Sequence, residues 1–248
     1  MKKKLLLSAL LTLSAVVLVV ATVLTTIAFL AHQATVTNTF TMGNIMINLY
    51  ESNVDKDGNK IADDPNIHGD MKDSVGNTYQ LSPNGSYDKD PTVYVMPESD
   101  ECILFVQVQN GLRHVEADED NGYKKMTNQM LENDWKFIGS NSYGNVYVYN
   151  GTPAGLTYNE DRYASVIPQL TNMLTIETFE KIKIKDDASR ENVDGKTITV
   201  HAYAIQKKSF TADNNYSLSK NEVVNAWDTL AENFDTAQKI DKFDQYIQ

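Results

Sequence analysis

The sequence predicts an all-β protein, an antiparallel β-sandwich with a C-terminal helix and polar loop insertions. Two observations predict this class. Apolar and polar residues alternate with a period of two along several short segments, which is typical of strands that bury one face. Loops rich in turn-forming residues separate these segments, a pattern that favours a sandwich over a parallel sheet crossed by helices.

The alternation marks each predicted strand in turn. It is clearest near the C-terminus, where Ile198, Val200, Ala202 and Ala204 share one face of a strand. A second long run begins at Cys102. The predicted strands are residues 44–49, 92–96, 102–109, 145–149, 181–185 and 197–205.

Three polar loops divide these strands, and none resembles a domain linker. Residues 52–76 are acidic and rich in Gly, Asn and Asp; residues 113–133 are charged and contain a predicted short helix at Lys124–Leu131; residues 186–195 form a turn between two strands.

One longer helix is predicted near the end of the chain. Ser219 and Glu222 form a capping box at its start. Val223, Trp227 and Leu230 then fall on one face, which we expect to dock on the sandwich. The tail from Asp235 to Gln248 is polar, and we expect it to be loosely held.

The N-terminus carries an export leader. Three lysines, Lys2–Lys4, precede an apolar run without charge from Leu5 to Ala31. This run is long enough for a signal peptide or for an uncleaved membrane anchor. Ala28 and the small side chain of Thr26, two positions earlier, favour cleavage between Ala28 and Phe29. We therefore expect a signal peptide at residues 1–28, with an anchor as the alternative, and a single β-sandwich domain at residues 29–248.

Charge and cysteine content narrow the range of functions and partners that this chain could have. The formal net charge is −11, which disfavours nucleic acid as a partner and suits an extracellular protein that attracts divalent cations. Cys102 is the only cysteine, so no intramolecular disulfide can form. Its place in an alternating apolar run indicates a buried small hydrophobe rather than a nucleophile.

Residues suited to catalysis are sparse. The four histidines are scattered, and no His-Glu-x-x-His, Gly-x-Ser-x-Gly or phosphate-binding glycine loop occurs. The sequence thus predicts a non-enzymatic protein, although a pair of carboxylates, as in glycosidases, is compatible with so acidic a chain.

One acidic loop resembles a calcium site. Asp55, Asp57, Asn59 and Asp63 match positions 1, 3, 5 and 9 of a calcium-binding loop, and the Ile61 carbonyl oxygen would serve at position 7. Two departures count against it, because Lys60 replaces the usual glycine and Asn66 replaces the bidentate glutamate. A solvated acidic turn is the alternative, and calcium is the one cofactor that the sequence suggests.

Four segments resemble the TasA/camelysin family, secreted proteins of Gram-positive bacteria that carry SipW-type signal peptides. The leader ends in TIAF, residues 26–29, and VTNTFTMGNI follows at residues 36–45. LSPNGSYDKDPTVYV at residues 81–95 resembles the family's strand with its preceding Pro-Gly turn, which here reads Pro-Asn-Gly. ITVHAYAIQ at residues 198–206, with Ala226-Trp227 downstream, is similar to its closing strand and helix.

The resemblance implies a jelly-roll-like sandwich that serves as a secreted biofilm-matrix or fibre subunit. Its implied partners are further copies of itself, a SipW-type signal peptidase, and other matrix or cell-wall components. In such fibres the N-terminal strand of one copy completes the sheet of the next.

The N-terminal segment has the pattern that such a strand requires. An apolar stripe, interrupted by His32 and Asn38, alternates with polar positions, so one face could insert into a groove. Pairing within the same domain is equally compatible with this pattern. The stripe comprises Leu30, Ala34, Val36, Phe40 and Met42.

Two other functions stay open. Some family members are called metalloproteases, which makes a camelysin-like cell-surface metalloprotease one alternative, although the sequence has no recognisable zinc motif. The other is a calcium-dependent surface adhesion module that uses the acidic loop.

Overall fold

The computed structural model describes residues 31–34, 44–55, 57–61, 77–120, 122–153, 156–211 and 215–245. Every strand pair in these residues is antiparallel, so the predicted all-β class is confirmed. The jelly-roll connectivity that the resemblance implies stays a prediction.

The largest sheet has six strands in the order β1-β11-β5-β7-β6-β13. Its longest members are β5 (Cys102–Asn110) and β11 (Ile198–Gln206), which pair along their whole length. The remaining strands are β1 (Ala31–Ala34), β6 (Trp135–Asn141), β7 (Gly144–Tyr149) and β13 (Lys242–Phe243).

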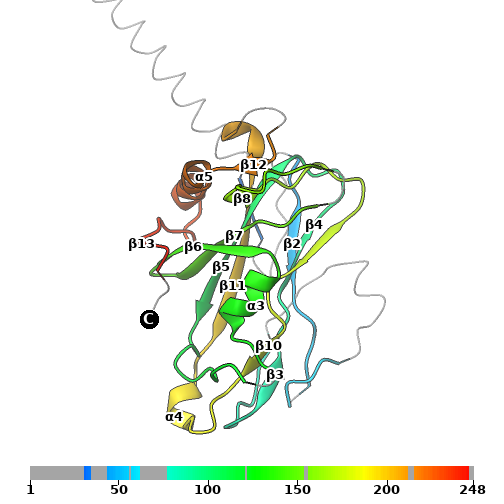
Figure 1. Ribbon diagram of the computed structural model, residues 1–248. Helices are drawn as coiled ribbons and strands as arrows, with labels where there is room; N and C mark the ends of the chain where they lie inside the picture. The colour runs from blue at the N-terminus through cyan, green and yellow to red at the C-terminus, as the bar shows by residue number, and fades with distance from the viewer. Residues whose placement is uncertain are drawn as a thin grey trace, which may run out of the picture.

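A three-stranded sheet packs against one face of this sheet, and a helix packs against the other (Figure 1). The smaller sheet has the order β2-β4-β9, from Ile47–Tyr50, Thr92–Val95 and Leu174–Glu177. The helix is α5 (Lys220–Asn233).

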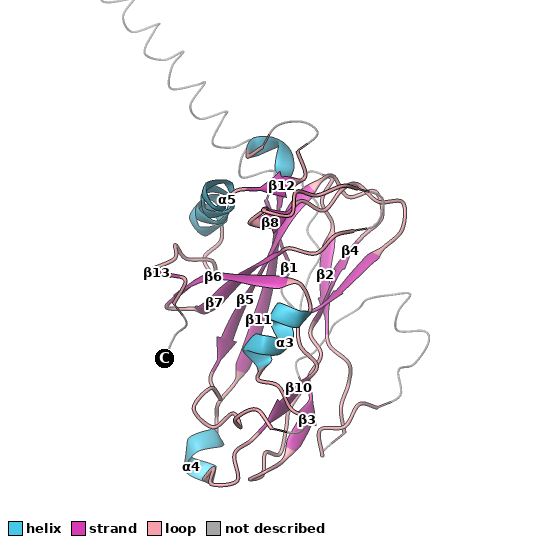
Figure 2. Ribbon diagram, viewed as in Figure 1, coloured by secondary structure: helices cyan, strands magenta, loops and turns pink. Residues whose placement is uncertain are grey.

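Short elements complete the fold (Figure 2). β3 (Ser86–Asp88) pairs with β10 (Lys181–Lys183), and β8 (Ala164–Ser165) pairs with β12 (Ser217–Leu218). The others are α3 (Met126–Glu132), α4 (Arg190–Val193) and the 3-10 turn η1 (Lys207–Ser209). Thus α3 confirms the short helix predicted near Lys124–Leu131, and α4 adds a helical turn to the predicted 186–195 loop.

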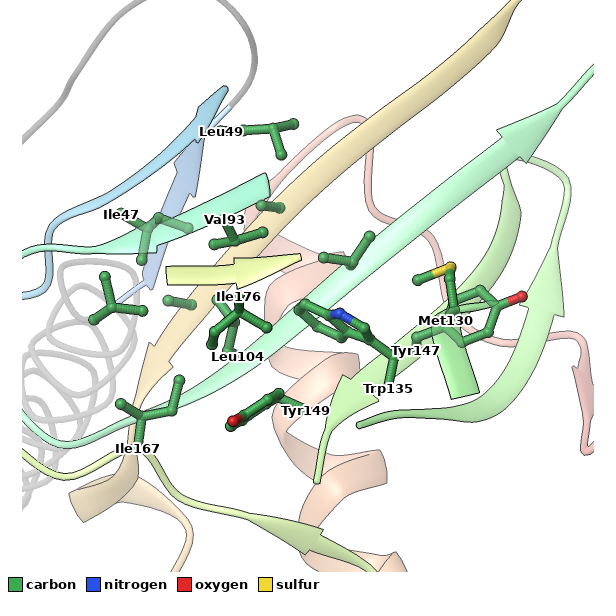
Figure 3. Close-up of a cluster of buried hydrophobic side chains, with 14 of the residues drawn as sticks. Ile47, Leu49, Val93, Leu104, Met130, Trp135, Tyr147, Tyr149, Ile167 and Ile176 are labelled. Atoms are coloured by element: carbon green, nitrogen blue, oxygen red, sulfur yellow. The ribbon is translucent and has the colours of Figure 1, made fainter. Parts of the chain in front are cut away.

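Alternation along the strands of the large sheet supplies two separate cores. On β5, Leu104 and Val106 face the smaller sheet, while Ile103 and Phe105 face α5. Figure 3 shows the first core, where Ile47 and Val93 of the smaller sheet lie opposite Leu104 and Trp135. Because both faces are covered, seven consecutive residues of β5 are buried.

The C-terminal helix forms as predicted. The Ser219 side chain accepts a hydrogen bond from the Glu222 amide, and the Glu222 carboxylate accepts one from the Ser219 amide at 2.7 Å. Val223, Trp227 and Leu230 are buried against the sheet.

The expectation of a loosely held tail is wrong for residues 237–243. Ala237 and Ile240 are buried in the helix-side core, and β13 pairs with β6. The few apolar side chains of a polar segment were enough to dock it, because each one fills space between the sheet and the helix.

Candidate functional site: a groove beside the open half of β11

In the part of the chain that the structure describes, the edge strand β1 covers only half of β11. Ala31 lies opposite Ile205 and Ala34 opposite Ala202, where the pairing in the described residues ends. The burial of β11 changes at the same place, since Ile198–His201 are half-buried and Ala202–Ile205 are buried. Within the described part of the chain, residues 198–201 therefore have β5 on one side and no strand on the other.

A pocket of about 1010 Å³ borders this half of β11. It lies at the end of the sandwich where β2, β10 and α4 approach β11, and apolar side chains dominate its described walls. These are Leu49, Leu81, Leu112, Ile182, Ile184, Val193, Ile198 and Val200.

A sheet edge beside an apolar groove is the geometry that accepts an added strand. Unpaired main-chain groups would supply the ladder of hydrogen bonds, and the groove would receive every second side chain of the incoming strand. Partial exposure of Ile198 and Val200 is compatible with a surface that gains cover on binding.

The predicted N-terminal strand falls partly within the described residues. Of its stripe, Ala34 lies in β1, and its backbone is paired with Ala202 of the same chain. Leu30, Val36, Phe40 and Met42 lie outside the described residues, as do the cleavage positions Ala28 and Phe29 and the remainder of the leader. Among the residues described, no helix has the length and apolar character of a membrane span.

The acidic loop is closed by its own hydrogen bonds. The Asp55 carboxylate accepts hydrogen bonds from the amides of Asp57 and Asn59, both at 2.9 Å. Gly58 takes a positive φ of 80° at the turn, a conformation that glycine adopts readily. The Ile61 amide bonds to the Asn53 carbonyl oxygen at 2.9 Å, and Asp63 lies outside the described residues. Calcium binding here stays a prediction.

Histidine, cysteine, aspartate and glutamate do not gather into a metal-binding group of three or more anywhere in the described ranges. Cys102 is fully buried, and burial, with a further contribution from Asp100, raises the pKa of its thiol to about 12. Burial also lowers the pKa of His201, whose Nδ1 has no hydrogen-bond partner among the described residues.

Sequence reasoning missed one polar cluster in the wall of this groove. Glu51 and Lys89 form a buried ion pair there, joined by Asn77 and Tyr79. These residues are far apart in the sequence, so no local pattern indicates that they form a cluster. The only sequence signal for it is Lys89, one residue beyond the short β3 strand.

The chain matches no protein-family model, no curated protein and no solved structure.

Proposed function

We propose that this chain is a secreted, non-enzymatic structural subunit that assembles with copies of itself by strand addition. The observation that carries the proposal is that, within the residues that the structure describes, β1 covers only half of β11, and the other half borders the apolar groove. The TasA/camelysin resemblance supports the same function, an extracellular matrix fibre of biofilm type.

The donor in this proposal is the N-terminal segment of another copy. Among the described residues, β1 is an edge strand that pairs with β11 through four residues. A strand of the same sequence from a second copy would pair with β11 in the same register and could continue along residues 198–201. Its alternating side chains would then set the register, because a slip by one residue would turn the apolar stripe away from the groove.

Deletion of residues 29–41 from the mature chain tests the donor. We expect the mature chain to form filaments in electron micrographs, and the deletion variant to remain monomeric and folded by size-exclusion chromatography and circular dichroism. Filaments from the deletion variant would overturn strand donation. Absence of filaments from the intact mature chain would overturn the assembly function itself.

A substitution in the groove tests the acceptor. Val200→Lys places a charge in the lining of the groove. An apolar side chain inserted beside this charge would bury it without a partner, which costs free energy. Thr175→Lys, at an exposed position of β9, is the matched control. We expect filament formation to be lost in Val200→Lys and retained in Thr175→Lys.

The N-terminal residue of the secreted chain, determined by sequencing, tests cleavage after Ala28.

A further inference from the structure

A lysine and a carboxylate are paired in the groove wall with little access to water. Lys89 Nζ lies 2.9 Å from both Glu51 Oε1 and Oε2. Each side chain is only 8% exposed. Lys89 precedes β4, and Glu51 follows β2, so the packing of these two strands fixes the pair.

An asparagine amide shares the same carboxylate oxygen. Asn77 Nδ2 donates to Glu51 Oε1 at 3.1 Å and to the Ser52 carbonyl oxygen at 2.8 Å. Its Oδ1 accepts a hydrogen bond from the Val54 amide at 3.2 Å. The Lys89 amine and the Asn77 amide both donate to Oε1, at 2.9 Å and 3.1 Å. The two nitrogen atoms are therefore separated by no more than the sum of these two distances.

The surroundings of the three groups are partly aromatic. The Tyr79 hydroxyl lies 2.9 Å from Glu51 Oε1, and Lys89 Nζ lies 5.9 Å from the centre of the Tyr79 ring. Burial, followed by the charge of Glu51, raises the pKa of Tyr79 well above its usual value. The hydroxyl therefore keeps its proton and acts as a donor.

We propose that Lys89 and Asn77 become joined by an intramolecular isopeptide bond, with Glu51 as the proton-transfer catalyst. A salt bridge would explain why Lys89 and Glu51 are buried together. It would not require the carboxamide of Asn77 to bond to the same carboxylate oxygen. A nucleophilic amine, an acyl carbon and a shared acid–base group are the three parts that amide exchange needs.

The reaction balances without any co-reactant. Lys89 transfers one proton to Glu51, which leaves a neutral amine and a carboxylic acid and removes two buried charges. The Nζ lone pair attacks Cγ of Asn77, so the Cγ–Nζ bond forms while the Cγ–Nδ2 bond breaks. Glu51 passes protons from Nζ to the departing nitrogen, which leaves as ammonium and returns Glu51 to its ionised form.

Two features of the site favour this step. The Val54 amide already donates to Oδ1, the oxygen on which negative charge develops during attack. The groove, which Asn77 and Lys89 both line, gives the released ammonium a path to solvent.

Peptide mapping of the purified chain by tandem mass spectrometry tests the bond. We expect one branched peptide that contains both Lys89 and Asn77, with a mass lower than the sum of its parts by one ammonia molecule. Recovery of the two residues in separate, unmodified peptides would overturn the proposal. A cyclised asparagine elsewhere also loses ammonia but gives no branched peptide, so it would count against the bond if it were the only change.

Three variants separate the roles of the residues. Asn77→Ala removes the acyl carbon and should abolish the branched peptide. Asn77→Asp should yield the same branched product, with water as the leaving group in place of ammonia. Glu51→Gln keeps the shape of the side chain but cannot shuttle protons, so the chain should fold without the bond. A branched peptide in Glu51→Gln would overturn the role of Glu51, and a wild-type chain with Lys89 attached to Glu51 instead would overturn the role of Asn77.

Discussion

Trp135 of β6 donates its indole Nε1 hydrogen to the main-chain carbonyl oxygen of Glu177 in β9, at 2.7 Å. This bond crosses from the six-stranded sheet to the three-stranded sheet, and Trp135 is 1% exposed. The two sheets are therefore joined by a specific polar contact as well as by apolar packing.

Replacement of this tryptophan tests the polar contact. In Trp135→Phe the ring is smaller and the Glu177 carbonyl oxygen loses its partner, so we expect the free energy of unfolding to fall by about 1–3 kcal/mol. Urea unfolding followed by circular dichroism measures this change. A free energy equal to that of the wild type would show that solvent or another donor satisfies Glu177.

Loss of Trp227 should loosen the helix from the sheet. Its ring is fully buried and lies 5.5 Å from the rings of both Phe105 and Tyr203, measured between ring centres. We expect Trp227→Ala to lower the free energy of unfolding by about 3–5 kcal/mol, because the large cavity cannot close. Leu131→Ala, at a position 47% exposed, is the control and should change it by less than about 0.5 kcal/mol. Equal effects of the two variants would contradict the docking of α5.

The capping box should make stability depend on acid pH. Burial opposes ionisation of Glu222, but hydrogen bonds from Ser219 outweigh it and hold the pKa of the Glu222 carboxyl below its usual value. A lowered pKa in the folded state means that the ionised carboxylate stabilises the fold above the unfolded pKa. This contribution is lost as the pH falls through the folded pKa.

Ser219→Ala should reduce the free energy of unfolding by about 1 kcal/mol at neutral pH, because the Glu222 amide loses its side-chain acceptor. Thermal unfolding of both chains between neutral pH and acid pH measures the difference. The gap should narrow as Glu222 becomes protonated, and a gap that widens at acid pH would contradict the capping role.

Cys102 should be inert in the folded chain. Its thiol is inaccessible, and its raised pKa leaves almost no thiolate near neutral pH. We expect labelling by an aromatic disulfide reagent only as fast as the protein opens, with rapid labelling in denaturant. Fast labelling under native conditions would show that β5 is not the covered central strand described here.

The strands with uninterrupted alternation were predictable, and β6 was not. Trp135 and Phe137 lie toward the smaller sheet, but the register shifts between Phe137 and Gly139, and Ile138 packs toward α5. A bulge of this kind breaks the two-residue period that a sequence pattern depends on. β5 shows a second limit of prediction from sequence. Its alternation predicts a strand but does not reveal that both faces of the strand are covered.

The groove and its polar cluster depend on contacts that no local pattern encodes. Glu51 and Lys89 are 38 positions apart, and Glu51 and Asn77 are 26 apart. The acidic loop, by contrast, was conspicuous as a motif, yet Asp55 holds the amides of its own turn. Spacing within a short segment thus predicted the helix cap well and gave no indication of which distant side chains would meet.

The pairing of β5 with β11 has a consequence for how the chain reaches its fold. Lys207 and Glu101, at the end of this pair, are 106 positions apart and form a salt bridge at 2.9 Å. The central pair therefore cannot form until the last third of the chain is available, and such non-local pairing is typical of domains that fold in milliseconds to seconds. Until β11 is available, β5 lacks one of its two neighbouring strands, so the large sheet cannot be completed before residues 198–206 have been made.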